Sequence, residues 1–422
     1  MSRDPIRTTP NSVRRLAVAQ QHLGGRAPSR SSPSAIQSVV RDLAYVQWDP
    51  VTTVAASHLL SLWCRLADFQ PAQLDRLLWK EKRLFQHWTP IASIVGTEDF
   101  PLYHALMRRY PASLSRSWGN QRARAQRFLT EHSDLRRTIL AELRDGPLQL
   151  GQFADHVRTK RRDGEWSPTS DVSEMLFHLT MTGEVMVVGH QGNQNLWGLS
   201  DRFLPAWVDR TEISESEAER EAAQRAIRAL GTATPREVTL YFVRGRYENL
   251  RATLQRLEEE SVIHRVVIVG PGEREERYVH DRDVSRLESM DRASWTPRVS
   301  LLPPFDNLLF SSARLSRLFG FDYVREQFLP KEKRRFGTYV LPILWGDRLI
   351  GRIDQRLDKA NGELVINAVH AEPGAPADRE VGAQIGATIA RLAEFVGASR
   401  VSYPARIPSA WKSSLPTRAR TR

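Results

Sequence analysis

The stretch ENLRATLQRLEEESVIHRVVIVGPGEREERYV, residues 248–279, decides the fold. Its first part carries apolar residues at helical spacing, which predicts a helix over residues 248–260. Two apolar, β-branched runs follow, at residues 262–269 and 277–279, separated by the turn residues Gly270–Gly272. This order predicts a β-hairpin directly after the helix.

Two more helices are expected just before this stretch. Residues 217–230 have helical periodicity, and Thr234 followed by Pro235 is a typical helix start. Three helices followed by a hairpin form a winged helix, a helix-turn-helix variant that binds nucleic acid in many proteins. The sequence therefore predicts a winged helix here.

The same pattern occurs about 85 residues earlier. Helices are expected over residues 134–143, 149–157 and 171–182, followed by a hairpin over residues 185–199. A repeat of this length fits one supersecondary unit. We therefore expect at least two winged helices in tandem.

The two ends of the chain differ from this middle part. The region up to about residue 130 is expected to be mostly helical, with one of its helices over residues 51–60. The region from Trp295 is β-rich, with a hairpin over residues 339–354 and a closing amphipathic helix over residues 378–396. A small barrel or sheet with one helix is expected there.

The predicted class is α+β, with tandem winged helices and a C-terminal, barrel-like β-rich domain. The expected boundaries are 1–130 for the first region, 131–205 and 206–292 for the two winged helices, 293–400 for the β-rich domain, and 401–422 for a basic tail.

The charge balance points to a polyanionic partner. The 422 residues include 61 Lys plus Arg and 49 Asp plus Glu, for a formal net charge of +12. Such a balance favours DNA or RNA, and less often an anionic membrane surface. Arg outnumbers Lys by 54 to 7, a bias typical of GC-rich codons, so part of the excess also has a genomic explanation.

Several classes of chemistry are disfavoured. Cys64 is the only cysteine, so neither an internal disulfide nor a Cys-ligated zinc or iron–sulfur site can form, and we expect it to be a buried structural thiol. The chain has no P-loop, dinucleotide loop, H-E-x-x-H or G-x-S-x-G motif. We expect no cofactor and no metal. With no apolar leader or membrane-length run, a cytoplasmic protein without membrane contact is expected.

The motif Gln47-Trp48-Asp49 and other dispersed segments resemble the YcaQ/AlkZ family of bacterial winged-helix DNA glycosylases. The resemblance covers nearly the whole chain. Besides the motif, it is carried by residues 74–88, 302–308, 318–321, 333–337, 339–354 and 369–370. It implies three tandem winged helices, the first of them within residues 1–130 and carrying the motif, and a C-shape around a basic channel. It also implies a monofunctional glycosylase that acts on N7-alkylguanine and interstrand crosslinks without a metal. The Q-x-D form is similar to the YcaQ-like branch. Residues 86–93 depart from the family pattern. If they position DNA or a lesion, a substrate range different from that of relatives is expected.

The resemblance implies that Gln47 and Asp49 are catalytic. A carboxylate stabilises the positive charge that develops on the sugar and accepts a proton from water, while an amide orients that water. From the residues alone, Asp49 before Pro50 favours a helix cap over a catalytic role, and only the resemblance reverses that preference. The expected DNA contacts are Trp48, His87, Lys331, Lys333, Arg334 and Arg335, with Asp306 as second-tier support. Trp48 and His87 could instead be core residues, and Asp306 a turn residue.

The expected partner is double-stranded DNA carrying alkylated or crosslinked guanine, bound by a monomer without a nucleotide cofactor. The alternative is a tandem winged-helix transcription regulator without enzymatic activity, or a catalytically silent DNA-binding relative. Neither of the third helices of the two repeats is strongly basic, which disfavours sequence-specific reading.

Overall fold

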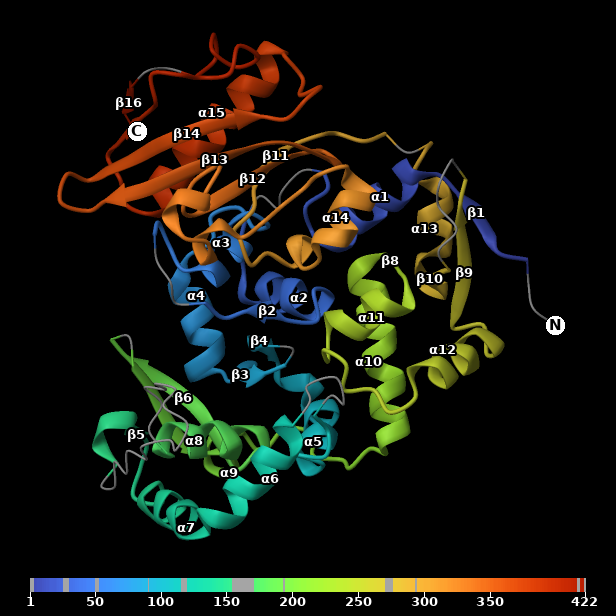
Figure 1. Cartoon of the computed structure of the whole chain (residues 1–422), viewed down its shortest axis with the longest axis vertical. Coiled ribbons are helices and arrows are strands. Elements are labelled where there is room, and N and C mark those ends of the chain that lie inside the picture. The colour runs from blue at the N-terminus through green and yellow to red at the C-terminus, as the bar shows by residue number, and fades with distance from the viewer. Residues whose placement is uncertain are drawn as a thin grey trace. The chain divides into compact units, whose positions relative to one another are not determined.

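The computed structural model of the chain describes residues 4–25, 30–49, 53–89, 91–114, 120–153, 171–192, 194–269, 276–292, 294–415 and 418–420. It has a mixed α+β fold with two compact units (Figure 1). Unit 1 comprises Met1–Gln70, Ile227–Thr234 and Val262–Arg422, and unit 2 comprises Pro71–Ala226 and Pro235–Ser261. Both units gather segments that are far apart in the sequence. The domain boundaries expected from the sequence stay predictions.

Unit 1 contains two sheets. The first has the order β1-β9-β10-β8, and the second has the order β11-β12-β13-β14-β15-β16. Their strands are β1 (Ile6–Thr8), β8 (Thr232–Ala233), β9 (Ile263–Ile268), β10 (Arg277–His280), β11 (Val299–Leu301), β12 (Val340–Trp345), β13 (Arg348–Asp358), β14 (Glu363–Ala371), β15 (Arg400–Ser402) and β16 (Arg418–Arg420). Unit 1 also contains the short strand β2 (Val46–Gln47), which belongs to neither sheet.

The helices of unit 1 lie before, between and after these strands. They are α1 (Pro10–Gln20), α2 (Pro33–Asp42), α3 (Ser57–Trp63), α13 (Val284–Ser289), α14 (Ser312–Phe319) and α15 (Arg379–Phe395), with the 3-10 turns η5 (Asp281–Asp283), η6 (Asn307–Leu309), η7 (Glu326–Phe328) and η8 (Lys331–Lys333). Helix starts follow capping rules: the Thr9 and Ser32 hydroxyls accept hydrogen bonds from Ser12 N and Ala35 N, and each is followed by a proline.

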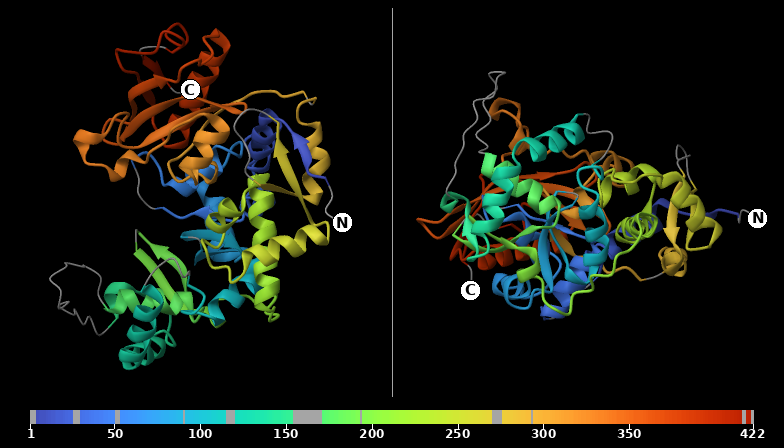
Figure 2. Two further views of the ribbon diagram at one scale, coloured as in Figure 1. Left: turned by 45° about the vertical axis from the view of Figure 1, so that its right-hand side comes forward. Right: turned by 90° about the horizontal axis from the view of Figure 1, so that it is seen from below.

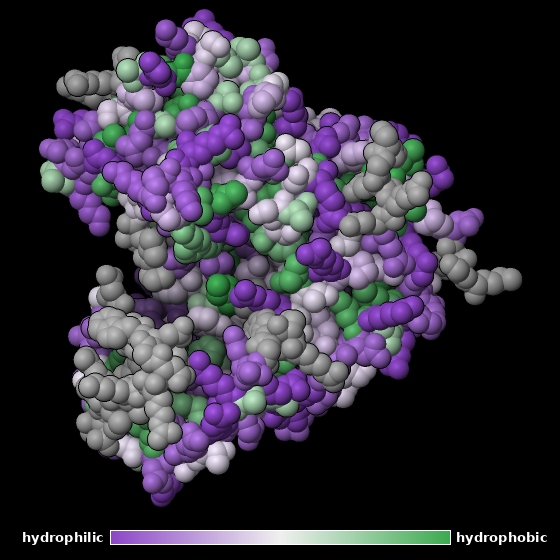
Figure 3. Space-filling model, viewed as in Figure 1, coloured by the Kyte–Doolittle hydropathy of each residue, from purple (hydrophilic) through white to green (hydrophobic). Residues whose placement is uncertain are grey.

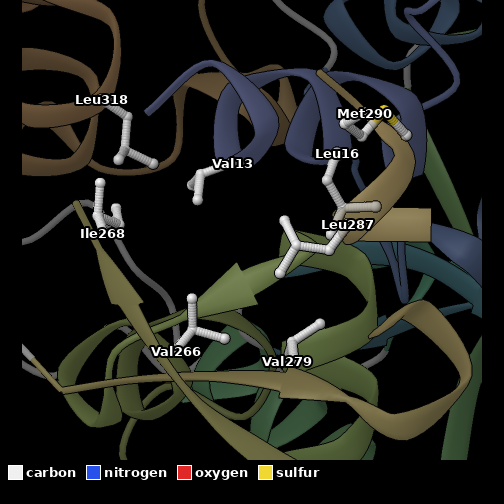
Figure 4. Packing of buried hydrophobic residues seen from close by; sticks show 8 residues of the cluster. All are labelled: Val13, Leu16, Val266, Ile268, Val279, Leu287, Met290 and Leu318. Carbon is white, nitrogen blue, oxygen red and sulfur yellow. The ribbon is translucent and has the colours of Figure 1, made fainter. Parts of the chain in front are cut away.

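The N-terminal helix α1 packs on the first sheet of unit 1. Its Val13 and Leu16 are buried against Val266, Val279 and Leu287, together with three further apolar side chains of the same unit (Figure 4). Burial of this cluster holds the N-terminal segment to a hairpin some 260 residues later in the chain, where Ile6 pairs in parallel with Val266.

The six-stranded sheet is the β-rich C-terminal region that the sequence predicts. Its hairpin β12–β13 spans residues 340–358, close to the expected 339–354, and α15 begins after Asp378 and contacts β11 and β15 (Figures 1 and 2). The visible outer surface in Figure 3 is mostly hydrophilic, with smaller hydrophobic patches between. No described helix is long and apolar enough to cross a membrane.

Unit 2 is built mainly of helices and two hairpins. Its helices are α4 (Pro71–Asp75), the π-helix η1 (Arg76–Lys80), η2 (Thr97–Asp99), α5 (Phe100–Arg108), α6 (Gln121–Glu131), α7 (Ser133–Glu142), η4 (Leu150–Gln152), α8 (Asp171–Met181), α9 (Ser200–Phe203), α11 (Pro235–Tyr241) and α12 (Leu250–Glu259). Its strands are β3 (Leu84–Trp88), β4 (Ala92–Gly96), β5 (Leu148–Gln149), β6 (Val185–Gln191) and β7 (Gln194–Leu199). Helix α10 (Glu215–Leu230) has residues in both units.

The two predicted repeats share a strand topology. In the first, the short strand β5 pairs with β7, the second strand of the β6–β7 hairpin. In the second, the short strand β8 pairs with β10, the second strand of the β9–β10 hairpin. Both short strands follow the first helix of their repeat, a feature that the sequence prediction did not include.

Three expectations require correction. The helix expected over residues 51–60 is α3, and it begins only at Ser57 because residues 53–55 form bends. The helix expected over residues 149–157 is a 3-10 turn, η4, in its described part, and its remainder lies outside the described residues. The first region is also less helical than expected, because it contains the β3–β4 hairpin.

Candidate active site

The motif Gln47-Trp48-Asp49 lies in unit 1, at the end of a short strand. Helix α2 ends at Asp42, Ala44 adopts a left-handed backbone conformation with φ of 67°, and β2 then runs through Val46 and Gln47. Gln47 is half-buried, and Asp49 is only 8% exposed. Because the nearest following helix begins at Ser57 with Ala56 as its N-cap, Asp49 does not cap it.

Trp48 makes a face-to-face contact within the same unit. Its ring stacks on His58 of α3 with centroids 4.0 Å apart and planes 14° from parallel. Trp48 is half-buried, so one part of it stays accessible. The stack fixes the middle residue of the motif, and its expected contact with DNA stays a prediction.

Tyr339, just before β12, is a neighbour of Asp49 that the sequence prediction did not single out. Burial raises the pKa of Tyr339 above its ordinary value, the neighbouring Ser57 hydroxyl lowers it, and the charge of Asp49 raises it again. The Tyr339 and Ser57 hydroxyls are both buried, and neither meets hydrogen-bond geometry with a partner among the described residues. The Tyr339 phenol is therefore within electrostatic reach of the Asp49 carboxylate, and the Ser57 hydroxyl acts on the same phenol.

The motif is held on both sides by residues of the C-terminal part of the chain. Before it, the Asn307 side chain donates a 3.0 Å hydrogen bond to the main-chain carbonyl of Tyr45. After it, the Leu357 N–H donates a 3.2 Å bond to the carbonyl of Thr53. These bonds tie the segment that contains the motif to η6 and to β13.

Asp306, the expected second-tier residue, forms a fully buried ion pair with Arg65. The guanidinium meets the carboxylate in two bonds of 2.6 and 2.9 Å, and both side chains are 0% exposed. Arg65 also donates to the carbonyl of Gln21 at 2.7 Å, and Asp306 accepts from Leu308 N at 2.9 Å. Asp306 thus caps the turn η6, whose next residue, Asn307, bonds to Tyr45 before the motif, and its support of the motif stays a prediction.

Cys64 lies beside this ion pair. Its thiol is buried, it donates to Ser61 O at 3.3 Å, and burial raises its pKa to about 12. The expectation of a buried structural thiol is confirmed.

His87, an expected DNA contact, is a core residue of unit 2 in this structure. Its side chain is 3% exposed and packs edge-on against Tyr103 with ring centroids 5.4 Å apart. Burial, and then the charge of Arg246, lower its pKa to about 3. The neutral imidazole offers little surface to a ligand, and its role in DNA binding stays a prediction.

The basic turn over residues 331–335 is exposed and well anchored. Lys331, Lys333 and Arg335 are exposed, whereas Arg334 folds back and donates to Leu329 O at 2.9 Å and to Thr338 Oγ1 at 3.0 Å. Among the described residues, Lys331 and Lys333 form no ion pair. Two cations of the turn are thus free to bind phosphate.

Two buried carboxylates hold the end of this turn. Glu326 accepts hydrogen bonds from the backbone of Phe336 and Gly337, at 2.7 and 3.0 Å. Asp354 accepts from the backbone of Thr338 and Tyr339, at 3.0 and 3.1 Å. A Cβ atom on Gly337 would lie 2.2 Å from Asp354, so the close approach requires glycine. The same carboxylate therefore connects the basic turn to Tyr339.

Much of the other positive charge is neutralised within unit 2. Arg108 pairs with Glu212, Arg109 with Glu215 and Glu248, and Arg124 with Glu174. Four further basic positions, residues 158 and 160–162, lie outside the described residues.

The residues that sequence reasoning missed are Ser57, Arg65, Asn307 and Tyr339. Tyr339 and Asn307 lie inside segments that carry the family resemblance, which is the only sequence signal that marks them. Their role comes from long-range packing, with sequence separations of about 240 to 290 residues from the partners they meet.

Comparison with known proteins identifies the family. A family model described as "DNA glycosylase AlkZ-like" matches residues 40–395. The solved structure of Streptomyces sahachiroi DNA glycosylase AlkZ is similar in fold, with a TM-score of 0.64 and 16% sequence identity, over 94% of this chain and 100% of that one. Since the family model spans the motif and the C-terminal residues that frame it, the chain belongs to the AlkZ-like DNA glycosylase family and is a DNA glycosylase.

Proposed function

We propose that this DNA glycosylase hydrolyses the N-glycosidic bond of N7-alkylated guanine, including guanines joined in interstrand crosslinks, with Gln47 and Asp49 as its catalytic residues. The observation that carries the proposal is Asp49 itself, a buried carboxylate whose charge acts on the buried Tyr339 phenol, in a segment tied down at both ends. A carboxylate held in this way is suited to stabilising charge in a transition state.

Asp49 has two tasks in the proposed reaction. As the C1′–N9 bond breaks, its electron pair goes to the base, and positive charge develops on the sugar near the carboxylate. A water oxygen then bonds to C1′ and passes a proton to Asp49. A guanine alkylated at N7 is already cationic and leaves as a neutral base, so the step needs no strong general acid.

Gln47 orients the water. Its amide can accept a hydrogen bond from the water and donate one to an oxygen nearby. Residues i and i+2 of an extended segment point to the same side, so Gln47 and Asp49 share a side while Trp48 turns to His58.

Tyr339 and Ser57 are proposed as positioning residues for Asp49. The raised pKa keeps Tyr339 protonated at neutral pH, so its phenol is a donor. Both hydroxyls are buried and each has hydrogen-bonding capacity left among the described residues. They can hold the carboxylate, or the water between them and it, in one orientation.

The proposal also includes the number of winged helices. The shared pairing of β5 with β7 and of β8 with β10 supports two winged helices built on one plan. The first region has the same order of elements, α2, β2, α3, α4 and the hairpin β3–β4. We therefore propose three winged helices, the first of which carries the catalytic motif.

The proposed DNA contacts are phosphate contacts. Lys331, Lys333 and Arg335 are exposed on an anchored turn, and cations of this kind supply affinity without reading sequence. Such a grip suits an enzyme that must find damage in any sequence. We further propose that the protein acts as a monomer on chromosomal DNA in the bacterial cytoplasm.

The test uses two substrates under single-turnover conditions. One is a duplex with a single N7-methylguanine, and the other is a duplex with one defined N7-guanine interstrand crosslink. Release of methylguanine and unhooking of the crosslink, both lost in Asp49→Asn and reduced in Gln47→Ala, are expected. Release of other damaged bases but neither of these would overturn the proposed specificity. Tight binding to one DNA sequence without release of any base would favour the regulator.

A further inference from the structure

The most exposed large apolar side chain of the described residues is Phe328, at the end of η7. It is 71% exposed, and Val324 on the same loop is 58% exposed. Transfer of an aromatic ring from water to an apolar environment lowers the free energy. An exposed phenylalanine has not gained this free energy in the unbound protein. Phe328 therefore presents a surface that gains free energy when a ligand covers it.

The loop that carries Phe328 is fixed from several sides. Arg325 donates to Pro304 O at 2.8 Å and to Leu309 O at 3.0 Å, and Glu326 binds two backbone amides further along. The N–H of Phe328 itself bonds to Arg325 O at 3.2 Å. The ring is thus held outward by a scaffold, which lowers the entropy lost on binding.

Cations follow Phe328 directly in the chain. Lys331, Lys333 and Arg335 are all exposed within seven residues of it. An exposed aromatic ring beside lysines and arginines is complementary to nucleic acid, where bases stack on the ring and phosphates meet the cations. An apolar protein partner would not explain the positive charge.

The loop is also connected to the catalytic motif. The Phe328 ring lies 6.0 Å from that of Phe305, centroid to centroid. Two residues after Phe305, Asn307 bonds to the carbonyl of Tyr45, which precedes the motif. One short segment, residues 305–307, therefore contacts both the exposed ring and the strand that carries Gln47.

We propose that Phe328 is a wedge that inserts between stacked base pairs of the bound duplex and unstacks the step next to the nucleotide under attack. This proposal rests on the proposed function. A glycosylase must distort the stack around its target, and apolar side chains inserted at a base step do so in other DNA-binding proteins. Lys331 and Lys333 hold the phosphates on either side, and the wedge is thereby a positioning residue, not a catalytic one.

The test uses the full chain and an undamaged duplex with 2-aminopurine, whose fluorescence rises when it is unstacked. Binding of the wild-type protein is expected to raise the signal, and Phe328→Ala is expected to abolish the rise. Phe328→Trp should restore it, whereas Val324→Ala, a matched loss of an exposed apolar side chain, should leave it intact. The melting temperature of all variants should stay unchanged, because the ring is exposed.

Base release provides the second readout. Phe328→Ala should slow release from duplex DNA about 5- to 100-fold, the range expected for loss of one stacking contact, and should slow it less from single-stranded DNA. The salt dependence of binding should not change, since the cations remain. A variant Phe328→Ala that keeps the full fluorescence rise overturns the wedge, as does a wild-type protein that produces no rise.

The two proposals can fail separately. A fluorescence rise that depends on Phe328, in a protein that releases no N7-alkylguanine, would leave the wedge standing and overturn the substrate. Normal release by Phe328→Ala together with an unchanged fluorescence rise would overturn the wedge alone.

Discussion

The side-chain amide of Asn307 donates a hydrogen bond to the main-chain carbonyl of Tyr45, two residues before Gln47. The two residues are separated by 262 positions in the chain. Together with the Leu357–Thr53 bond on the other side of the motif, this bond ties the segment that contains Gln47-Trp48-Asp49 to C-terminal residues.

Removal of this bond should affect catalysis as well as stability. Asn307→Ala leaves the buried carbonyl of Tyr45 without this donor, which should lower the free energy of unfolding by about 1–3 kcal/mol. The rate of base release should also fall, about tenfold, because the motif loses one of its two fixed ends. Asn361→Ala, which loses only the side-chain bond of Asn361 to Asp358 in an exposed turn, is the control and should change neither quantity. A loss of stability with an unchanged single-turnover rate would argue against the link.

The buried ion pair of Arg65 and Asp306 should be the most sensitive point of unit 1. Asp306→Ala leaves a buried guanidinium without its carboxylate, a change that costs about 3–5 kcal/mol in comparable pairs. Asp134→Ala, from the exposed pair with Arg137, should cost at most about 1 kcal/mol. Urea unfolding of both variants measures the difference. Similar small losses in the two variants would contradict the assigned role.

Acid should destabilise the protein through its buried histidines. Burial lowers the pKa of His87 to about 3 and that of His178 to about 4, against 6.5 for an ordinary histidine. As the pH falls below about 6.5, the unfolded chain takes up protons that the folded chain refuses, so the free energy of unfolding falls until about pH 3. For His87 alone, the loss between pH 7 and pH 4.5 is at most about 3 kcal/mol.

A pair of variants isolates this contribution. His87→Leu should lose less stability between pH 7 and pH 4.5 than the wild-type protein, as measured by urea unfolding at both values. His132→Gln, at a half-buried position after α6, should show the wild-type loss. Equal losses for wild type and His87→Leu would show that His87 is not kept neutral by the fold.

The lysines of the basic turn should control the salt dependence of DNA binding. Lys331→Ala with Lys333→Ala removes two expected phosphate contacts, so the slope of log K against log salt should become shallower by about 1.8. Affinity should fall to a similar extent on damaged and undamaged duplexes. Lys359→Ala with Lys412→Ala removes the same charge from other exposed positions of unit 1 and should leave the slope unchanged. An equal effect of both pairs would mean that net charge alone, not the turn, determines binding.

The sequence predicts the helices and strands correctly where their apolar residues recur at a regular spacing. Helix α8 ends one residue earlier than expected, and β9 and β10 match their expected segments within one residue. The apolar spacing of these segments reflects the faces that they bury, so the pattern itself carries the information. The late start of α3 was missed because the Asp49-Pro50 signal resembles a helix start, while the helix begins at Ser57.

The residues that surround the Gln47-Trp48-Asp49 motif in the fold could not be predicted from the sequence in this way. Nothing in the local pattern of Asn307 or Tyr339 marks them as partners of Tyr45 and Asp49, because these contacts form only when distant segments pack. The same holds for the parallel pairing of β1 with β9. The motif itself was found only through its resemblance to a family, since Asp before Pro is common at helix starts.

The most direct test of the central claim is the single-turnover rate of N7-methylguanine release by Asp49→Asn, which keeps the size of the side chain and removes its charge. The rate should fall about 10²- to 10⁴-fold with unchanged duplex affinity and melting temperature. Asp42→Asn, which changes an exposed carboxylate at the end of α2, should release base at the wild-type rate. Wild-type release by Asp49→Asn would contradict the assignment of Asp49 as the group that carries the chemistry.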